Sequence, residues 1–347
     1  MLVTEGQVLN SLRSVEDPDL KKDVVSLGFI KNLSIDGGRV SFELELTTPA
    51  CPMKAQLKTA AEEAVKRIEG VTEVNVDVTS NVPSHRMPGN EEILPGVKNI
   101  IAVASGKGGV GKSTVSVSLA VAMAKTGAKV GLLDTDIYGP SIPIMMGVTE
   151  KPEIRDNKLI PIVKYGVSLM SIGFLIPEDT PLIWRGPMVM KAVEQLLTDV
   201  EWGELDYLLM DLPPGTGDVQ LTLSQKVPLT GAVIVTTPQD VALLDVVRGI
   251  SMFRKLNVPI LGVVENMSFF SCPHCGGRSD IFSHGGGKAA SEKLDVPFLG
   301  EVPIDLKIRE GGDAGRPVSA DDSASPQSRV FMSLGEQLAA RISALGK

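Results

Sequence analysis

The 347-residue sequence has few of the residues from which disulfide-rich, nucleic-acid-binding or membrane-spanning proteins are built. Three cysteines are too few, and odd in number, for a disulfide framework, so we predict a reducing, cytoplasmic location. The formal net charge of −8 argues against a nucleic-acid partner. No apolar run approaches the ~18 residues of a membrane helix, and the N-terminus has neither a signal-peptide nor a transit-peptide pattern. We therefore expect no membrane partner either.

The length and a change of pattern along the chain predict two domains. Residues 1–79 combine two segments of helical spacing with two alternating, half-buried strands, which is typical of a small α+β domain. Residues 80–98 are polar and interrupted by proline and glycine, so we expect a linker there. In residues 99–347, near-continuous apolar runs alternate with helical segments. This pattern predicts an α/β fold with a mostly parallel sheet covered by helices on both faces.

The segment "GKGGVGKS" at 106–113 matches the phosphate loop G-x-x-x-x-G-K-[ST], with an apolar strand before it and a helix after it. Its glycines allow backbone N–H groups to surround phosphate oxygens at a helix N-terminus. We expect Lys112 to reach the β- and γ-phosphates and Ser113 to bind Mg²⁺. A second lysine in the loop, Lys107, suits a highly charged triphosphate. The predicted nucleotide-contacting residues are Gly106, Lys107, Gly108, Gly109, Val110, Gly111, Lys112, Ser113 and Thr114.

Carboxylate and amide side chains end three of the predicted strands. Asp211 ends "YLLMD", where a magnesium-binding carboxylate is expected at the carboxyl edge of the sheet. Asp134 and Asp136 end another strand; one of them caps the turn in one interpretation, and Asp136 is the better placed to orient an attacking water. Asn266 ends a third strand, where its amide suits an adenine edge, although a turn-forming asparagine is the alternative.

Four motifs taken together, "GKGGVGKST", "DTDIYGPS", "DLPPGTGD" and "VVENM", resemble the deviant Walker A ATPases, the class that includes MinD, ParA and the nitrogenase iron protein. With "SCPHCG" downstream, the resemblance narrows to the Mrp/ApbC family of iron–sulfur cluster carriers. Residues 1–79 resemble the accessory domain often fused to bacterial members. The resemblance therefore covers nearly the whole chain.

The resemblance implies an ATPase that uses ATP and Mg²⁺, acts as a homodimer, and moves a [4Fe–4S] cluster from a scaffold to apo-protein clients. It implies that Lys107 contacts nucleotide across the dimer interface, that Asp136 positions water and that Asn266 binds adenine. Lys107, Lys112 and Asp136 are thus the predicted catalytic residues. The C-terminal "SLGEQLAARISALGK" has too few basic residues for a membrane-targeting helix of the MinD kind.

Two of the three cysteines, Cys272 and Cys275, stand in "CPHCGG", and this pair has three interpretations. A redox dithiol needs a helix after the first cysteine, whereas the glycines that follow favour a metal knuckle. A zinc site within one chain needs two more ligands, for which His274, His284 and Cys51 are the soft candidates. In a two-fold dimer the pair meets its own copy, and four thiolates suit a [4Fe–4S] cluster.

We therefore predict a bridging, transferable cluster. The alternative function is a nucleotide-switched partitioning or scaffold ATPase whose cysteine pair holds structural zinc. Cys51 lies in the first predicted domain, as a structural thiol or an auxiliary ligand. Colour and metal content after anaerobic reconstitution distinguish the two functions.

Overall fold

The structure is a computed structural model that describes residues 3–18, 20–86, 93–137, 139–175, 186–322 and 324–345, without the side chains of residues 186–187, 189–190, 218 and 240–242. The chain divides into two compact units, Met1–Pro83 with Ala339–Lys347, and Ser84–Leu338. Of the predicted linker at 80–98, residues 87–92 lie outside the described residues. No helix among the described residues is long and apolar enough to cross a membrane.

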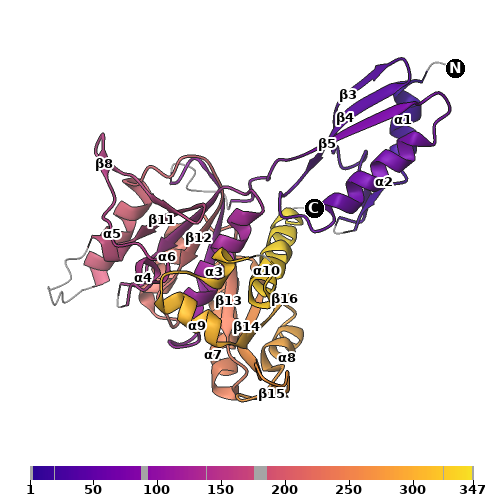
Figure 1. Ribbon diagram of the computed structural model, residues 1–347. Helices are drawn as coiled ribbons and strands as arrows, with labels where there is room; N and C mark the ends of the chain where they lie inside the picture. The colour runs from indigo at the N-terminus through magenta and orange to yellow at the C-terminus, as the bar shows by residue number, and fades with distance from the viewer. Residues whose placement is uncertain are drawn as a thin grey trace. The chain divides into compact units, whose positions relative to one another are not determined.

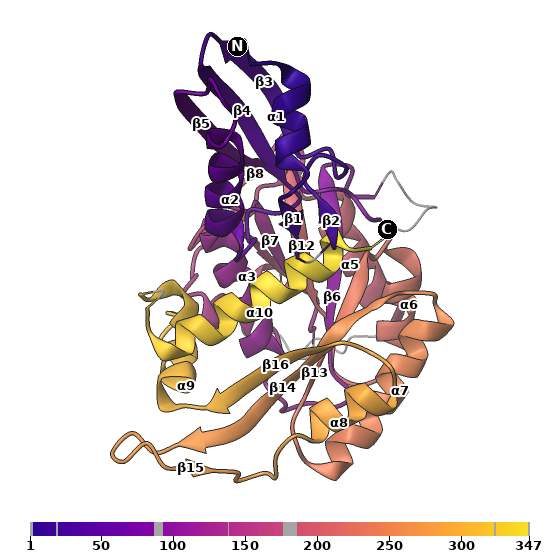
Figure 2. The ribbon, with the colours of Figure 1, turned by 90° about the vertical axis from the view of Figure 1, so that its right-hand side faces the viewer.

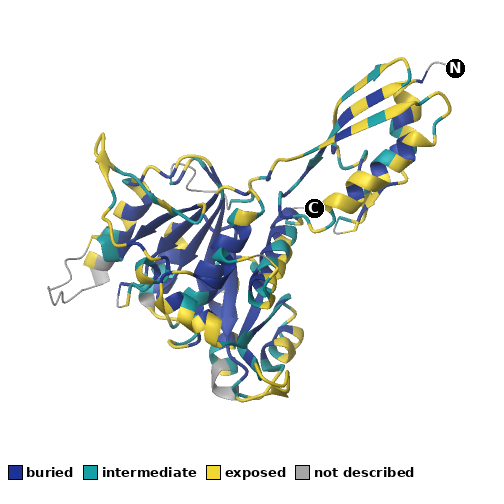
Figure 3. Cartoon of the chain, in the orientation of Figure 1, coloured by how far each residue is buried: buried dark blue, intermediate teal, exposed yellow. Residues whose placement is uncertain are grey.

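The first unit is a three-stranded sheet with two helices packed on it (Figure 1). In its longest strand pair, alternate residues such as Val40, Phe42 and Leu44 are buried, which is the period-2 pattern of a sheet with one covered face (Figure 3). The first helix begins at a capping box formed by Thr4 and Gln7. The elements are α1 (Glu5–Leu12), β1 (Glu16–Asp17), β2 (Lys22–Asp23), β3 (Ile30–Asp36), β4 (Arg39–Leu46), α2 (Lys54–Lys66) and β5 (Glu73–Ser80).

The second unit is built on a nine-stranded sheet in the order β10-β11-β7-β12-β6-β13-β14-β15, with β16 also paired to β14. The central strands are parallel, and β10 and β15 pair antiparallel at its two ends. The strands of this sheet are β6 (Val97–Ala104), β7 (Val130–Asp134), β10 (Ile162–Lys164), β11 (Val167–Ser171), β12 (Leu205–Asp211), β13 (Gly231–Thr236), β14 (Ile260–Ser271), β15 (Arg278–Ser279) and β16 (Phe298–Ile304). A separate hairpin joins β8 (Ile154–Arg155) to β9 (Lys158–Leu159).

Helices cover both faces of this sheet, as the apolar strand pattern predicts, with α3 on one side and α6 and α7 on the other (Figure 2). The helices are α3 (Lys112–Lys125), α4 (Ile142–Met145), α5 (Gly186–Thr198), α6 (Asp218–Lys226), α7 (Asp240–Lys255), α8 (Gly286–Lys293), α9 (Leu306–Asp313) and α10 (Pro326–Ser343), with 3₁₀ turns at Ile172–Phe174 and Val318–Ala320. A parallel sheet with helices on both faces is the doubly wound α/β arrangement.

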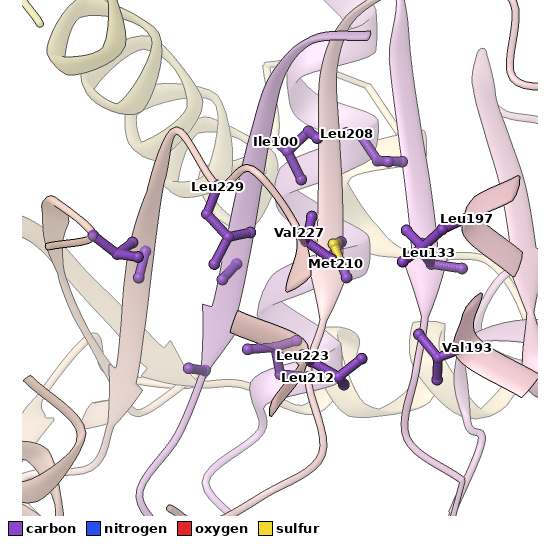
Figure 4. Packing of buried hydrophobic residues seen from close by; sticks show 14 of the residues in the cluster. Ile100, Leu133, Val193, Leu197, Leu208, Met210, Leu212, Leu223, Val227 and Leu229 are labelled. Carbon is purple, nitrogen blue, oxygen red and sulfur yellow. The ribbon is translucent and has the colours of Figure 1, made fainter. Parts of the chain in front are cut away.

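The main core lies between the sheet and α5, α6 and α7. Ile100, Leu208 and Met210 from the strands face Val193 and Leu223 from the helices (Figure 4). On the opposite face, α3 is buried almost all round, which is typical of a helix enclosed by protein on every side. Gly335 of α10 approaches α3 so closely that an added Cβ would lie 3.1 Å from the Met123 side chain. This packing fixes α3, whose first residue is Lys112.

Candidate nucleotide site and cysteine hairpin

The phosphate loop connects β6 to α3, so the N-terminus of a buried helix points at it. Gly109 and Gly111 have φ values of 80° and 78°, a left-handed conformation that strains any residue with a side chain. Gly111 is the N-cap of α3, and no side chain caps the free N–H groups of the first turn. These N–H groups are available to phosphate oxygens.

A cavity of about 240 Å³ lies on the phosphate loop. It brings together eight of the predicted residues with four others: the residue after β6, the N-cap and last residue of α4, and one from the loop after β12. Gly106, Val110, Asp211 and Asn266 do not line it. The lining residues are Ser105, Lys107, Gly108, Gly109, Gly111, Lys112, Ser113, Thr114, Asp136, Ser141, Met145 and Pro214.

Asp211 is fully buried, and its carboxylate accepts three side-chain hydrogen bonds. Lys112 Nζ and Ser113 Oγ each lie 2.7 Å from Asp211 Oδ2, and Ser116 Oγ lies 2.5 Å from Oδ1. The Ser113 hydroxyl and the Asp211 carboxylate are oxygen donors of the kind that Mg²⁺ prefers, so this pair fits the ion. Lys112 itself is only 6% exposed, which makes its pairing with Asp211 a buried ion pair.

The two aspartates at the end of β7 have different environments. Asp134 is buried, accepting hydrogen bonds from the backbone N–H groups of Asp136 and Ile142 and from the Ser171 hydroxyl. Asp134 is also the register partner of Asp211 on β12. Burial, and then the Asp211 charge, raise the pKa of Asp134 to about 7. Asp134 therefore holds the turn, while Asp136 reaches the cavity.

Asn266 lies beside the phosphate loop. Its Nδ2 donates to the Val110 carbonyl at 2.8 Å, and a Cβ added to Gly111 would lie 2.2 Å from the same nitrogen. The amide therefore supports the loop and retains its oxygen for another partner. Strand β14 does not end at Asn266 as the sequence predicts. It continues past a register shift, where Met267 has a φ of 56°.

Lys107 differs from Lys112 in having no hydrogen bond or ion pair of its side chain within the part of the chain that the structure describes. The loop around it lies against α7, because a Cβ added to Gly106 would lie 2.3 Å from the Asp245 Cβ. Two apolar residues next to Asp245 on α7 are exposed, Leu244 at 65% and Val247 at 41%. The phosphate loop thus borders an apolar surface.

The cysteine pair lies in a hairpin between β14 and β15 (Figure 2). The Cys272 N–H donates to the Gly277 carbonyl, and the Gly276 N–H donates to the Cys272 carbonyl, each at 2.9 Å. Gly276 has a φ of 70°, so the turn requires glycine there. Strand β15, not a helix, follows Cys275.

Both thiols are free, with Cys275 exposed and Cys272 half-buried. Hydrogen bonds from the backbone N–H groups of Cys275 and then His274, together with the Cys275 thiol, lower the pKa of Cys272. His274 is exposed, and His284 bonds to Glu301. Among the described residues, no third cysteine, histidine or carboxylate groups with the two thiols.

Sequence reasoning missed several of these residues. Ser116 has a detectable signal, because it stands three positions after Ser113 on the same helix and therefore shares its face. Ser141 and Met145 reach the cavity from the N-cap and the last residue of α4, and Ser171 bonds to Asp134 from another strand. No local pattern indicates these long-range placements.

A strand–loop–helix phosphate site with a buried carboxylate on the neighbouring strand defines a P-loop NTPase of the MinD and ParA type. The cell-division ATPase MinD of Pyrococcus furiosus is 25% identical, with a TM-score of 0.53 over 69% of this chain and 97% of that one. A nucleotide-binding protein of Archaeoglobus fulgidus, solved with ADP, is 42% identical, with a TM-score of 0.60 over 67% of this chain and 92% of that one.

A family model described as the NUBPL iron-transfer P-loop NTPase matches residues 96–339, and one described as an iron-sulfur cluster assembly protein matches residues 5–78. The chain belongs to the family of iron-transfer P-loop NTPases. It is 49% identical over 99% of both chains to the iron-sulfur cluster carrier protein of a Synechocystis strain.

Proposed function

We propose that this protein is an ATP-hydrolysing carrier that binds a [4Fe–4S] cluster between two copies of itself and transfers it to apo-proteins. The observation that carries the proposal is the hairpin in which Cys272 and Cys275 are accessible together without a third ligand among the described residues. Family membership supports iron transfer, and the phosphate loop supports a nucleotide cycle.

In the proposed nucleotide site, backbone N–H groups at the start of α3 hold the phosphates. Lys112 leaves Asp211 for the β- and γ-phosphates, and Ser113 and Asp211 hold Mg²⁺ through their oxygens. The ion would neutralise phosphate charge. Asp136, half-buried at the cavity, accepts a proton from the attacking water or orients it. The amide of Asn266 recognises adenine from beneath the loop.

A homodimer completes this site in our proposal. The Lys107 side chain has no hydrogen bond or ion pair within the described residues, and the adjacent Gly106 lies against Asp245 of α7. Leu244 and Val247 on the same helix are exposed. An apolar surface beside a catalytic cleft is a common place for a second chain. We therefore propose that these residues lie in the dimer interface and that Lys107 contacts the partner's nucleotide.

The number of thiolate ligands indicates that the proposed cluster site is shared between two chains. A [4Fe–4S] cluster needs four thiolates, whereas one hairpin offers two. A two-fold axis beside the hairpin brings two identical pairs together. Hydrogen bonds from backbone N–H groups already stabilise the Cys272 thiolate, which favours metal binding. Ligands shared between chains separate when the dimer opens, and this suits delivery to a client.

We also propose that residues 1–79 act as an accessory domain, residues 80–98 as a linker and residues 99–347 as the ATPase domain. The first unit has its own core, formed by residues such as Val8, Phe42 and Leu57, which supports independent folding. A scaffold that donates the cluster and apo-proteins that receive it are the proposed partners.

The decisive experiment uses mixed dimers with two different affinity tags, one chain wild type and one Cys272→Ala/Cys275→Ala. A bridging cluster predicts iron and sulfide near zero in the mixed dimer, since two of four thiolates are missing. A metal site within each chain predicts half of the wild-type content. That second result, or zinc in place of iron in the wild type after anaerobic reconstitution, would contradict the proposal.

Cys51→Ala is the matched control for thiol removal, because Cys51 lies in the other unit of the chain. We expect cluster content per dimer to remain at the wild-type value. A large fall in iron would show that Cys51 is a cluster ligand. Each chain would then supply more than two thiolates, and the reason for a cluster shared between two chains would be lost.

A further inference from the structure

Two glutamates stand side by side on neighbouring parallel strands near the cysteine hairpin. Strands β14 and β16 run side by side (Figure 2). Glu265 on β14 is the register partner of Glu301 on β16. Like charges directly opposite one another destabilise a sheet unless a cation lies nearby. The nucleotide site has the same arrangement, because Asp134 and Asp211 are also register partners. There, Lys112 supplies the cation.

Glu265 has no such lysine or arginine. It is fully buried, and its partners are the Ser268 hydroxyl and the backbone N–H groups of Gly285 and Gly287. No ion pair to Glu265 exists within the described part of the chain. Buried carboxylates are rare unless a positive charge accompanies them, so this position favours a bound cation.

The remaining ligands come from the loop before α8 and from β16. His284 Nε2 lies 3.0 Å from Glu301 Oε1. One ligand atom each of Glu265, His284 and Glu301 lies within 4.8 Å of the others. His284 is 39% exposed, which leaves a path for an ion from solvent.

We infer that Glu265, His284 and Glu301 form a site for a single divalent first-row transition-metal ion, separate from the thiol pair. One imidazole with two carboxylates suits Mn²⁺, Fe²⁺, Co²⁺ or Zn²⁺, whereas Mg²⁺ prefers oxygen alone. The inference concerns different ligands from the proposed cluster site and does not rest on it.

Arg278 does not replace the ion. Its guanidinium stacks on the Phe269 ring at 4.1 Å and bonds to Asp280 at 3.0 Å, and it reaches Glu301 only at 3.7 Å. These contacts hold the Arg278 guanidinium near the Glu301 carboxylate. The buried Glu265 carboxylate has no positively charged partner among the described residues. An ion bound here would join β14, which continues into the cysteine hairpin, to β16 and to the loop before α8.

The test uses the full-length Cys272→Ser/Cys275→Ser chain without nucleotide, so that thiolates do not bind the probe. Titration with Co²⁺, followed by its visible absorption and by calorimetry, should show one saturable site per chain. His284→Gln and Glu301→Gln should each weaken binding by at least about 10- to 100-fold, as loss of metal-site groups does. His274→Gln, at the exposed histidine of the hairpin, should leave affinity unchanged.

If Glu265, His284 and Glu301 only stabilise the fold, the titration should give a different result. Glu265 would then only cap α8, and Co²⁺ would bind without saturation or with equal affinity in His284→Gln. Either result overturns the inference. A second measurement guards against unfolding: the melting temperature should rise with Co²⁺ in the Cys272→Ser/Cys275→Ser chain and not in its His284→Gln derivative. An equal rise in both chains would also overturn it.

Discussion

Lys112 and Asp211 at the phosphate loop are 6% and 0% exposed and are joined by a direct ion pair, whereas Cys275 in the hairpin is exposed and both thiols are free. The buried network holds its groups by hydrogen bonds and an ion pair within the chain before any ligand arrives. The exposed pair presents half of a ligand set. The buried network supplies its phosphate and Mg²⁺ ligands from one chain, whereas the cysteine pair needs two further ligands from another molecule.

Two acidic side chains are buried side by side near the phosphate loop, which is unfavourable for stability and has no counterpart in the hairpin. Asp134 and Asp211 are paired in register and buried together, so one of the two carboxylates is held partly protonated near neutral pH. Mg²⁺ and Lys112 are the cations that relieve this repulsion in the proposed cycle. Mutations in the buried Lys112–Asp211 network should therefore change stability and activity together, while mutations in the hairpin should change only metal binding.

Among the variants that test this difference between the phosphate loop and the hairpin, Lys112→Ala should have the largest effect on turnover and on stability. Turnover should be abolished, because the charge facing the β- and γ-phosphates is lost. The free energy of unfolding should fall by about 3–5 kcal/mol, because Asp211 then stays buried without its ion partner. Steady-state ATPase assays and urea denaturation measure the two effects.

Lys107→Ala is the control for that experiment. Lys107 is half-buried and makes no ion pair within the described residues, so its stability change should stay within about 0.5 kcal/mol. Equal destabilisation by Lys112→Ala and Lys107→Ala would show that the buried ion pair of Lys112 does not stabilise the fold.

Asp136→Asn should slow hydrolysis by about 10²- to 10⁴-fold while nucleotide still binds. An amide accepts a proton far less well than a carboxylate, and Asp136 lines the cavity. Single-turnover hydrolysis and equilibrium binding of a labelled nucleotide measure the two properties. Loss of binding would assign Asp136 to structure.

A pair of glycine variants tests how tightly the loop is supported. Gly109→Ala and Gly111→Ala both place a side chain at positive φ, but only a Cβ at Gly111 meets Asn266, at 2.2 Å. Breaking the buried Asn266–Val110 hydrogen bond costs on the order of 1–3 kcal/mol, so Gly111→Ala should lose about tenfold more nucleotide affinity than Gly109→Ala. Equal affinities would show that Asn266 does not support the loop.

The Asp134 carboxyl should make the free energy of unfolding depend on pH. Its ordinary pKa is 3.8, and burial followed by the Asp211 charge raises it to about 7 in the folded protein. Between these values the folded state binds one more proton than the unfolded state, so stability should fall as the pH rises from about 4 to 7 and then level off. Asp134→Asn should remove this slope in urea titrations. Parallel curves for the two proteins would contradict the assignment.

The smallest effect on stability is expected in the hairpin. Cys272→Ser/Cys275→Ser should change the free energy of unfolding by less than about 0.5 kcal/mol, because the thiols pack against little. Cluster binding should nevertheless be lost. Thermal melts of the metal-free proteins provide the measurement, and a shift as large as that of Lys112→Ala would show that the hairpin is also a structural element.

Much of the fold and of the site is encoded in local patterns. The apolar runs became the central parallel strands, and the small α+β pattern of residues 1–79 became a three-stranded sheet with two helices. The phosphate loop was recognisable because phosphate binding needs glycine at fixed positions before a helix. Asp136 and Asn266 were predicted because strand ends of a parallel sheet meet at one edge. Asp136 lines the cavity, whereas β14 continues past Asn266, which lies beside the loop. Their roles toward nucleotide stay predictions.

The tertiary structure decided what depends on contacts between distant segments. It distinguished Asp134 from Asp136, because only packing determines which of two neighbouring carboxylates is buried against Asp211. It placed Asn266 on the Val110 carbonyl and continued β14 into the hairpin. It also brought Glu265, Glu301 and His284 together, although no local pattern joins them. Sequence alone determined which chemical groups the chain carries at each strand end and turn. Burial, register and charge balance arise only when the strands lie side by side, so these were determined by the fold.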